Sequence, residues 1–435
     1  MASRTSEIRK LVALLGAAAL LFVACSNAGT TTSPNADAQG DVEVFSWWTG
    51  GGEAAGLDAM IAVFKEKYPD VTFVNAAVAG GAGTNARAVL ATRLQADDPP
   101  DSFQGHAGQE LIGTYVAADQ LESLNSLFDE IGLKDKLPST LIPLISLGDT
   151  IYSVPVNIHR ANVLWYNPTV LSDNGIEPPT TWDEFLTAAE KLKTAGVIPL
   201  SLGEQWTTMH LFESVLLGSL GADKYSALWT ADGDWASADV TAAIDTYVQV
   251  LEYTNEDAAS LTWQDASKLV ADGSAAMNIM GDWADGYFSG TTEGGNLGLT
   301  PETDYGWAPT PGTDGVFQFL SDSFTLPKNA PHAATAKAWL TIAGSKEGQE
   351  AFNPVKGSIC ARTDCDKNLF NVYLKSAIDD WASDTIVGSL THGVVAADPY
   401  KNAINDALGL FLGDRDGAAF QSALVAAHDG ADGPK

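Results

Sequence analysis

Strand-like and helix-like patterns alternate through the first part of this sequence, between residues 42 and 106. Three short apolar stretches, "VEVFS", "VTFVNAAV" and "DPPDSFQGH", have the pattern of buried strands. Two amphipathic segments, 53–70 and 84–97, separate them, the second opening at Thr84. The first of these carries its large apolar residues on one helical face, at Leu57, Met60, Ile61 and Phe64. This strand–helix alternation predicts an α/β fold with a mainly parallel sheet.

The alternation resumes further along the chain. The stretch "TWDEFLTAAEKLKTAG" predicts a helix capped by Thr181, with Glu184 at the third helical position. A strand at 197–203 and a helix at 207–220 follow. With 435 residues, the chain exceeds what one hydrophobic core usually supports, so we expect two domains.

The N-terminal residues have the features of an export signal. Basic residues precede an apolar run at 11–24, which is too short to span a membrane and typical of a signal peptide, expected at 1–24. The run ends in "LFVAC", which resembles the lipobox of bacterial lipoproteins, with Phe22 where leucine is usual. This resemblance implies lipid attachment at Cys25, and a plain secreted protein is the alternative. Small polar residues then predict a flexible tether over 25–40.

Charge and cysteine content limit the partners and the compartment. The formal net charge of −31 argues against nucleic acid or an anionic membrane as the main partner. Apart from Cys25, only Cys360 and Cys365 are present. In an exported chain this pair can form a short-loop disulfide or remain as two free thiols.

The sequence lacks the motifs of nucleotide-binding proteins, serine hydrolases and zinc enzymes. It has no GxxxxGK[ST], GxSxG, HExxH or CxxC stretch. The six histidines are scattered, and none has ligand spacing to another. We therefore expect neither a metal site nor a cofactor.

Aromatic and polar residues instead gather where predicted strands end. The stretch "FSWWTGGGE", 45–53, follows the first strand, and "FQGH", "VNIHR", "SLGEQW" and "MGDW" occupy similar places. Ligands of open α/β sheets bind at such ends. Tryptophan offers a flat apolar surface to the face of a pyranose, and carboxylates, Lys, Gln and His can hydrogen-bond its hydroxyls. The glycines of 45–53 would let backbone and ligand approach each other.

Over nearly its full length after the signal, the sequence resembles the bacterial extracellular solute-binding proteins of sugar ABC importers. Within them it is most similar to the glucose/mannose (aldohexose) branch. The similarity lies in long ordered segments, among them "VEVFSWW", "AGGAGTNARAVL", "SVPVNIHRANVLWYN", "MGDWADGY" and "GSKEGQEAFNPVKGSI". It implies a two-lobed, type II-like periplasmic-binding-protein fold with a ligand cleft between the lobes. The lobes would comprise 41–155 plus 320–366 and 156–319 plus 367–435.

The same resemblance implies a set of sugar-binding residues. Stacking surfaces are expected from four tryptophans and hydrogen bonds from six polar side chains. These are Trp47, Trp48, Trp263 and Trp283, with Glu53, Gln104, His106, Asp322, Lys356 and His392.

The implied function is a lipid-anchored, monomeric receptor on the outer face of the cytoplasmic membrane. It would capture glucose, or also mannose or galactose, between closing lobes and deliver the sugar to an ABC permease. The resemblance implies no catalytic residue. Two alternatives remain at this point: binding of an oligosaccharide or other solute, and a secreted glycoside hydrolase using paired carboxylates.

Overall fold

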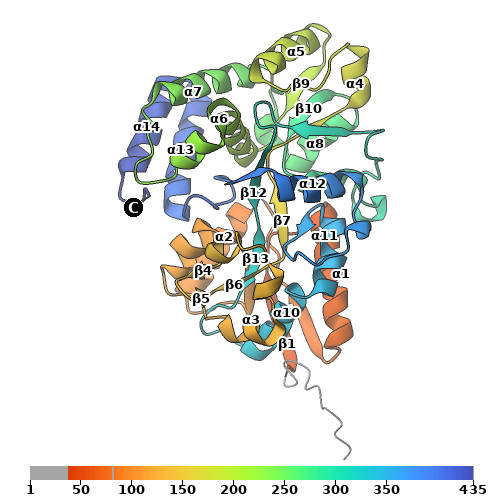
Figure 1. Ribbon diagram of the computed structural model, residues 1–435, viewed down its shortest axis with the longest axis vertical. Coiled ribbons are helices and arrows are strands. Elements are labelled where there is room, and N and C mark those ends of the chain that lie inside the picture. The colour runs from red at the N-terminus through yellow and green to blue at the C-terminus, as the bar shows by residue number, and fades with distance from the viewer. Residues whose placement is uncertain (1–37, 81–82, 435) are drawn as a thin grey trace, which may run out of the picture.

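The computed structural model describes residues 38–80 and 83–434 (Figure 1). The predicted signal peptide, the lipid-attachment residue Cys25 and all but the last residues of the predicted tether lie outside this part of the chain. Within it, no helix has the length and apolar character that crossing a membrane requires.

The N-terminal strands and helices are those predicted. Strands β1 (Gly40–Phe45), β2 (Val71–Asn75) and β3 (Ser102–His106) alternate with helices α1 (Gly51–Lys67) and α2 (Thr84–Gln95). The predicted apolar face of α1 is buried. β1 pairs in parallel with β2 and with β3, as a strand–helix–strand chain requires.

The first sheet is nevertheless mixed, so the prediction of a mainly parallel sheet is wrong. Its order is β2-β1-β3-β13-β6. β13 (Asp322–Thr325) lies antiparallel to β3, and β6 (Ser153–Pro155) lies antiparallel to β13. These two strands belong to chain segments that cross from one lobe to the other, so crossover helices do not set their direction.

Two four-stranded sheets build the rest of the molecule. One has the order β11-β8-β10-β9 and the other β14-β7-β12-β15. Their strands are β7 (Asn157–Arg160), β8 (Val163–Tyr166), β9 (Ile198–Ser201), β10 (Ala275–Ile279), β11 (Gly306–Pro309), β12 (Val316–Leu320), β14 (Ile359–Cys360) and β15 (Thr385–Gly388). A two-stranded hairpin joins β4 (Ser146–Leu147) to β5 (Thr150–Ile151).

Helices cover these sheets on both lobes (Figure 1). Helix α5 (Trp182–Thr194) has the predicted cap, since the Thr181 hydroxyl accepts a hydrogen bond from the Glu184 N–H. A π-helical turn, η2 (Glu110–Val116), follows β3. The remaining α-helices are α3 (Asn125–Ile131), α4 (Pro168–Asp173), α6 (Gln205–Ala227), α7 (Ala238–Leu251), α8 (Trp263–Ala271), α9 (Trp283–Ser289), α10 (Ala333–Ala343), α11 (Lys346–Lys356), α12 (Val372–Ser383), α13 (Asp398–Asp414) and α14 (Gly417–Asp429).

Two single residues link the first sheet to the sheet β14-β7-β12-β15, which is the central sheet of the molecule. Val156 separates β6 in the first sheet from β7 in the central sheet, and Ser321 separates β12 from β13 in the same way. β7 and β12 therefore run through the middle of the molecule, between two lobes (Figure 1). The predicted two-lobed α/β architecture is confirmed, whereas the exact limits of each lobe remain a prediction.

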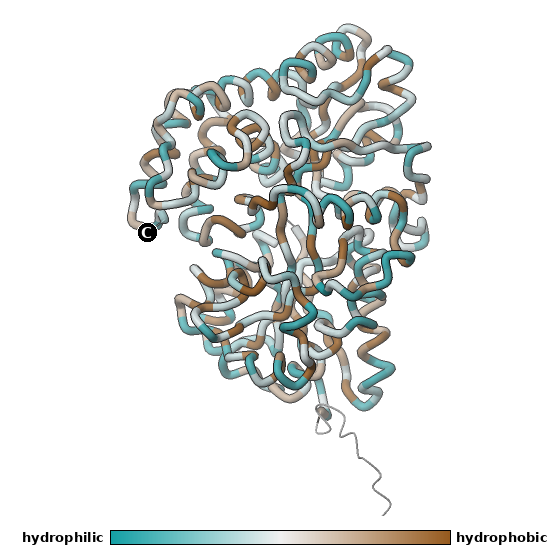
Figure 2. Tube along the Cα trace, in the orientation of Figure 1, coloured by the Kyte–Doolittle hydropathy of each residue, from teal (hydrophilic) through white to brown (hydrophobic). Residues whose placement is uncertain are grey.

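The buried apolar side chains form two clusters. One cluster centres on the first sheet and includes Phe64, Phe103 and Trp339. A second, built on α6, α7, α13 and α14, includes Phe212 and Tyr247. The hydropathy-coloured trace shows apolar segments in both halves of the molecule (Figure 2). The first cluster extends beyond the first sheet to Trp206, Trp263 and Trp283, and these tryptophans border the cavity described next.

Candidate sugar-binding site

A cavity of about 230 Å³ lies where the two lobes meet. Nine of the ten predicted binding residues line it, and Gln104 is the exception. Side chains of both lobes contribute, so that closing or opening the lobes would change its shape. The lining residues are Trp47, Trp48, Thr49, Glu53, Ala79, Gly80, Gly83, His106, His159, Glu204, Trp206, Thr262, Trp263, Gln264, Trp283, Leu320, Asp322, Lys356 and His392.

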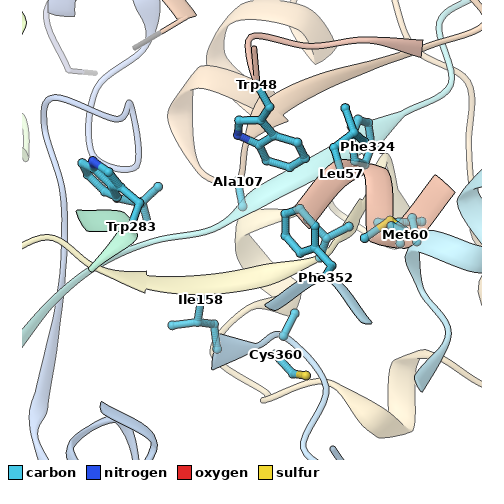
Figure 3. Packing of buried hydrophobic residues seen from close by; sticks show 14 of the residues in the cluster. Trp48, Leu57, Met60, Ala107, Ile158, Trp283, Phe324, Phe352 and Cys360 are labelled. Atoms are coloured by element: carbon cyan, nitrogen blue, oxygen red, sulfur yellow. The ribbon is translucent and has the colours of Figure 1, made fainter. Parts of the chain in front are cut away.

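Tryptophans form the apolar walls because each stands at the end of a strand or the start of a helix. Trp47 and Trp48 follow β1, while Trp263 and Trp283 are the first residues of α8 and α9. A capping box formed by Thr262 and Asp265 fixes the start of α8. The ring centroids of Trp48 and Phe352 lie 4.9 Å apart. Figure 3 shows these two side chains beside each other and Trp283 away from them.

Asp322 is the centre of the polar floor. It opens β13 and is paired across the sheet with His106, the last residue of β3. Its carboxylate accepts hydrogen bonds from Gln104 Nε2 at 2.9 Å and from Asn157 Nδ2 at 2.7 Å. Burial alone would raise the pKa of Asp322, but its electrostatic interactions with the neighbouring His159 and His106 rings hold it well below its usual value. Asp322 is therefore ionised and accepts only.

Gln104 supports the site from behind the cavity wall. Its side-chain oxygen accepts from the Trp47 N–H at 3.2 Å while its nitrogen donates to Asp322. It thereby ties the turn after β1 to the first residue of β13. The predicted direct contact of Gln104 with ligand stays a prediction, because Gln104 is 1% exposed and does not line the cavity.

An ion pair joins the two sides of the cavity rim. Lys356 Nζ, at the end of α11, lies 3.4 Å from Glu53 Oε1 on α1. The ammonium also lies 5.7 Å from the centroid of the Trp48 ring and 5.9 Å from that of Trp283. Burial raises the pKa of Glu53, and Lys356 opposes this rise.

The glycines after the tryptophans do not all have the predicted role. Gly51 and Gly52 belong to the first turn of α1, not to an open turn. A Cβ on Gly52 would lie 2.9 Å from the Val355 carbonyl oxygen and 3.0 Å from the Gly286 carbonyl carbon. These glycines let α1 pack closely on α9 and α11, which brings Glu53 to Lys356. Gly52 therefore serves helix packing, whereas ligand approach at Gly50, where a Cβ would meet nothing within 4 Å, stays a prediction.

Four of the six histidines meet around Trp283, although they are far apart in the sequence. The ring of His392 lies 5.1 Å from Trp283, 5.5 Å from His106 and 5.6 Å from His210. His159 lies 5.4 Å from Trp283. The histidines are scattered in the sequence but not in the folded protein, so the interpretation of them as scattered is wrong. β3, β7, α6 and the turn before α13 bring these four together.

One group of three side chains within the described ranges could hold a metal ion. Ligand atoms of His210, Glu213 and His392 all lie within 4.8 Å of one another. Both oxygens of Glu213 are hydrogen-bonded to the chain at 389–391, and His392 Nδ1 lies 2.9 Å from the Ser389 hydroxyl. The expectation of no metal site therefore stays a prediction.

Sequence reasoning also missed part of the cavity wall. Glu204, Trp206 and Gln264 line it without having been selected, although Trp206 follows a predicted strand and is a further stacking surface. The cysteine pair lies behind α11, outside the cavity. Cys360 and Cys365 form a disulfide, which closes a short loop after Lys356.

Comparison with known proteins decides the family. The sequence profile described as bacterial extracellular solute-binding protein matches residues 48–350, well over half of the chain. The protein belongs to this family.

Curated relatives and solved structures agree with this assignment. A probable sugar-binding periplasmic protein of Brucella suis is 33% identical, with 90% of this chain and 93% of the relative covered. The xylose/arabinose-binding protein XacG of Haloferax volcanii is 30% identical over 92% of this chain and 86% of its own. The solved bacterial solute receptor AcbH, described as exclusively preferring β-D-galactopyranose, superposes with a TM-score of 0.77 at 20% identity, covering 90% of this chain and 98% of its own. The solute-binding protein described here therefore has the two-lobed fold of periplasmic sugar-binding proteins.

Proposed function

We propose that this solute-binding protein captures a monosaccharide, an aldohexose such as glucose, and delivers it to the permease of an ABC importer. The observation that carries the proposal is the pairing of tryptophan walls with an ionised Asp322 and the Glu53–Lys356 pair in one small cavity. Such walls match the apolar faces of a pyranose and such groups match its hydroxyls. The volume of about 230 Å³ lies below the ~300 Å³ at which sites for drug-sized ligands begin.

The roles proposed for the residues follow from their places. Trp47, Trp48, Trp263 and Trp283 would stack on the sugar, while Asp322 would accept from hydroxyls. Glu53, Lys356, His106 and His392 would bond the remaining hydroxyls, and Gln104 would contribute through Asp322. The relatives named for pentoses and galactopyranose support a sugar as ligand and leave the choice among aldoses to experiment.

A second cavity favours a larger ligand as the alternative. It also measures about 230 Å³, and it shares Glu204 and Trp206 with the first. A ligand that displaced the Trp206 ring would reach both cavities. The second candidate function is therefore binding of a disaccharide or longer saccharide at the same cleft.

Tryptophan fluorescence and calorimetric titration of the purified protein test both candidates. The ligands are glucose, mannose, galactose, xylose, arabinose, maltose and trehalose. Saturable binding of one or two hexoses, with weaker or absent binding of disaccharides, is the expected result. Binding of disaccharides alone would replace the monosaccharide proposal by the second candidate.

We further propose that the protein is a receptor and not an enzyme. A glycoside hydrolase would release product from its sugar, whereas a receptor returns the sugar unchanged. Chromatography of each ligand after prolonged incubation distinguishes the two classes, and the appearance of any hydrolysis product would contradict the proposal.

The transport cycle would use lobe closure. We propose lobes of 41–155 plus 320–366 and 156–319 plus 367–435, closing about the sheet changes at Val156 and Ser321. The monomer would be held to the outer face of the cytoplasmic membrane through a lipid on Cys25. Replacing Cys25 by Ser should move the protein from the membrane fraction to the medium or periplasm.

A further inference from the structure

One buried carboxylate holds the turn that carries His392. Glu213, on α6, is 0% exposed. Its Oε2 accepts from the Leu390 N–H at 2.6 Å and from the Thr391 N–H at 3.1 Å, while its Oε1 lies 2.9 Å from the Ser389 hydroxyl. Neither Glu213 nor Ser389 lines the cavity, but the turn that they fix brings His392 into its wall.

The hydrogen bonds of this turn have a direction. Burial raises the pKa of Glu213 to about 7, so above this pH the carboxylate is ionised and only accepts, from the Leu390 and Thr391 N–H groups and from the Ser389 hydroxyl. The Ser389 oxygen then accepts from the His392 side, where Nδ1 lies at 2.9 Å and the backbone N–H at 3.3 Å. Nδ1 must therefore carry a proton. Burial, assisted by the neighbouring His106 and His210, lowers the pKa of His392 well below its usual value, so the ring is neutral and its Nε2 is unprotonated.

The other two cavity histidines have a different arrangement. His106 Nδ1 lies 3.0 Å from Glu110, and His159 Nδ1 contacts Asp282. Their Nε2 atoms lie 3.6 Å and 3.4 Å from the ionised Asp322, which can only accept from them. Both rings therefore face carboxylates at Nδ1 and at Nε2. In contrast, the Ser389 hydroxyl lies between the His392 ring and the Glu213 carboxylate.

We propose that Glu213, acting through Ser389, is a positioning residue that fixes His392 in the Nδ1–H tautomer, so that Nε2 offers the sugar site a hydrogen-bond acceptor. The inference rests on the proposed function, because it assumes a hydroxylated ligand in this cavity. It adds a specificity rule to the site: the ligand must present a hydroxyl that can donate to His392.

Glu213→Gln is the variant that reverses the direction of the Ser389 hydrogen bonds while keeping the shape of the side chain at position 213. The glutamine oxygen must still accept from the backbone N–H groups of Leu390 and Thr391, so its NH₂ turns to Ser389. Ser389 then accepts from the glutamine and donates to His392 Nδ1. His392 should change to the Nε2–H tautomer.

Long-range ¹H–¹⁵N correlation spectra of the imidazole rings measure the tautomer without any ligand. They are recorded near pH 8, above the pKa of about 7 to which burial raises Glu213. A His392→Gln variant assigns the signal, and Glu190→Gln on the exposed face of α5 is the matched control. The expected result is Nδ1–H in the parent protein and in the control, and Nε2–H in Glu213→Gln. The same tautomer in the parent protein and in Glu213→Gln would overturn the proposal, as would a signal that changes on adding EDTA.

A second arm tests the specificity rule and separates it from the proposed function. Singly fluorinated analogues of the bound sugar lack one donor each. One analogue should bind the parent protein about tenfold more weakly than the sugar, and this loss should disappear in Glu213→Gln. An equal loss in both proteins would contradict the rule. Absence of all sugar binding would refute the proposed function, while the spectra would still decide the tautomer. If Glu213→Gln does not fold, Ser389→Ala breaks the same link and should give a mixture of tautomers.

Discussion

Glu53 Oε1 lies 3.4 Å from Lys356 Nζ, across the contact between α1 and α11. The two residues are distant in sequence, and each lies within reach of the cavity that Trp48 and Trp283 border. The pair places a buried cation between two indole rings and a carboxylate whose pKa burial has raised. A ligand hydroxyl can therefore donate a hydrogen bond to Glu53 or accept one from Lys356.

Replacing Lys356 by Met should weaken sugar binding by roughly tenfold to a hundredfold. The change removes a charge-assisted donor, and such bonds contribute about 1.5–3 kcal/mol. It also leaves Glu53 without its cation. Calorimetric titration with the best sugar ligand measures the effect, and Lys367→Met, on the exposed surface, is the control. Equal affinity of parent and Lys356→Met would remove Lys356 from the site.

Replacing Gly52 by Ala should destabilise the fold and weaken ligand binding together. The new Cβ would meet the Val355 carbonyl at 2.9 Å, which is closer than packing allows, so α1 must move away from α11. We expect the free energy of unfolding to fall by about 1–3 kcal/mol. Gly413→Ala, at an exposed position of α13, is the matched control, because a Cβ there meets nothing within 4 Å. It should be neutral or stabilising by up to about 1 kcal/mol. Urea unfolding measures both, and equal effects of the two changes would contradict the packing argument.

Much of the site could be predicted because its residues stand at the ends of clearly patterned elements. Trp47 and Trp48 follow a predicted strand, and the alternation of strands and helices already brings strand ends to one edge. The role of Gly52 could not be predicted, since it depends on α11, far along the chain. A glycine required for helix contact and one required for an open turn look alike in sequence.

The histidine cluster and the mixed sheet escaped prediction for a related reason. His210 lies within an apolar helix, where its spacing to other histidines carries no information about contacts through space. β13 joins the first sheet from a segment that crosses between lobes, and local patterns do not record the direction of such a strand. Long-range pairing, and not local propensity, decided both features.

The pH dependence of stability should include a contribution from Asp285. This carboxylate is buried on α9, where it accepts from Tyr305 Oη at 2.5 Å and from Asn371 Nδ2 at 2.7 Å. Burial raises its pKa from 3.8 to about 6, and the two hydrogen bonds oppose this. Between these values the folded protein binds the proton more tightly than the unfolded chain, so this group's contribution falls as pH rises.

Asp285→Asn removes that titration. The difference in free energy of unfolding, parent minus variant, should be largest near pH 4 and should decrease by up to about 3 kcal/mol toward pH 7. Urea unfolding at several pH values between these limits measures the difference. A difference that stays constant with pH would show that folding leaves the pKa of Asp285 unchanged.

Trp283 should be the strongest single contributor to sugar affinity. Its indole is 6% exposed, borders the cavity and packs edge-on against His392 at 5.1 Å and His159 at 5.4 Å. Because these contacts already fix the indole, little conformational entropy is lost when its face packs on the ligand. Buried aromatic anchors contribute about 2 kcal/mol or more, so Trp283→Ala should weaken binding about thirtyfold or more.

The test must separate lost stacking from lost stability, because truncating a buried tryptophan also opens a hole in the packing. Trp283→Phe keeps a smaller ring and should lose less affinity than Trp283→Ala. Trp381→Ala on α12, which packs on Phe317 and Phe319 away from the cavity, is the control for stability alone. Sugar titration of all three variants, after thermal melts confirm folding, measures the order of affinities. If Trp283→Ala binds sugar as tightly as Trp381→Ala, the stacking surface must be supplied by Trp47, Trp48 and Trp263 without it.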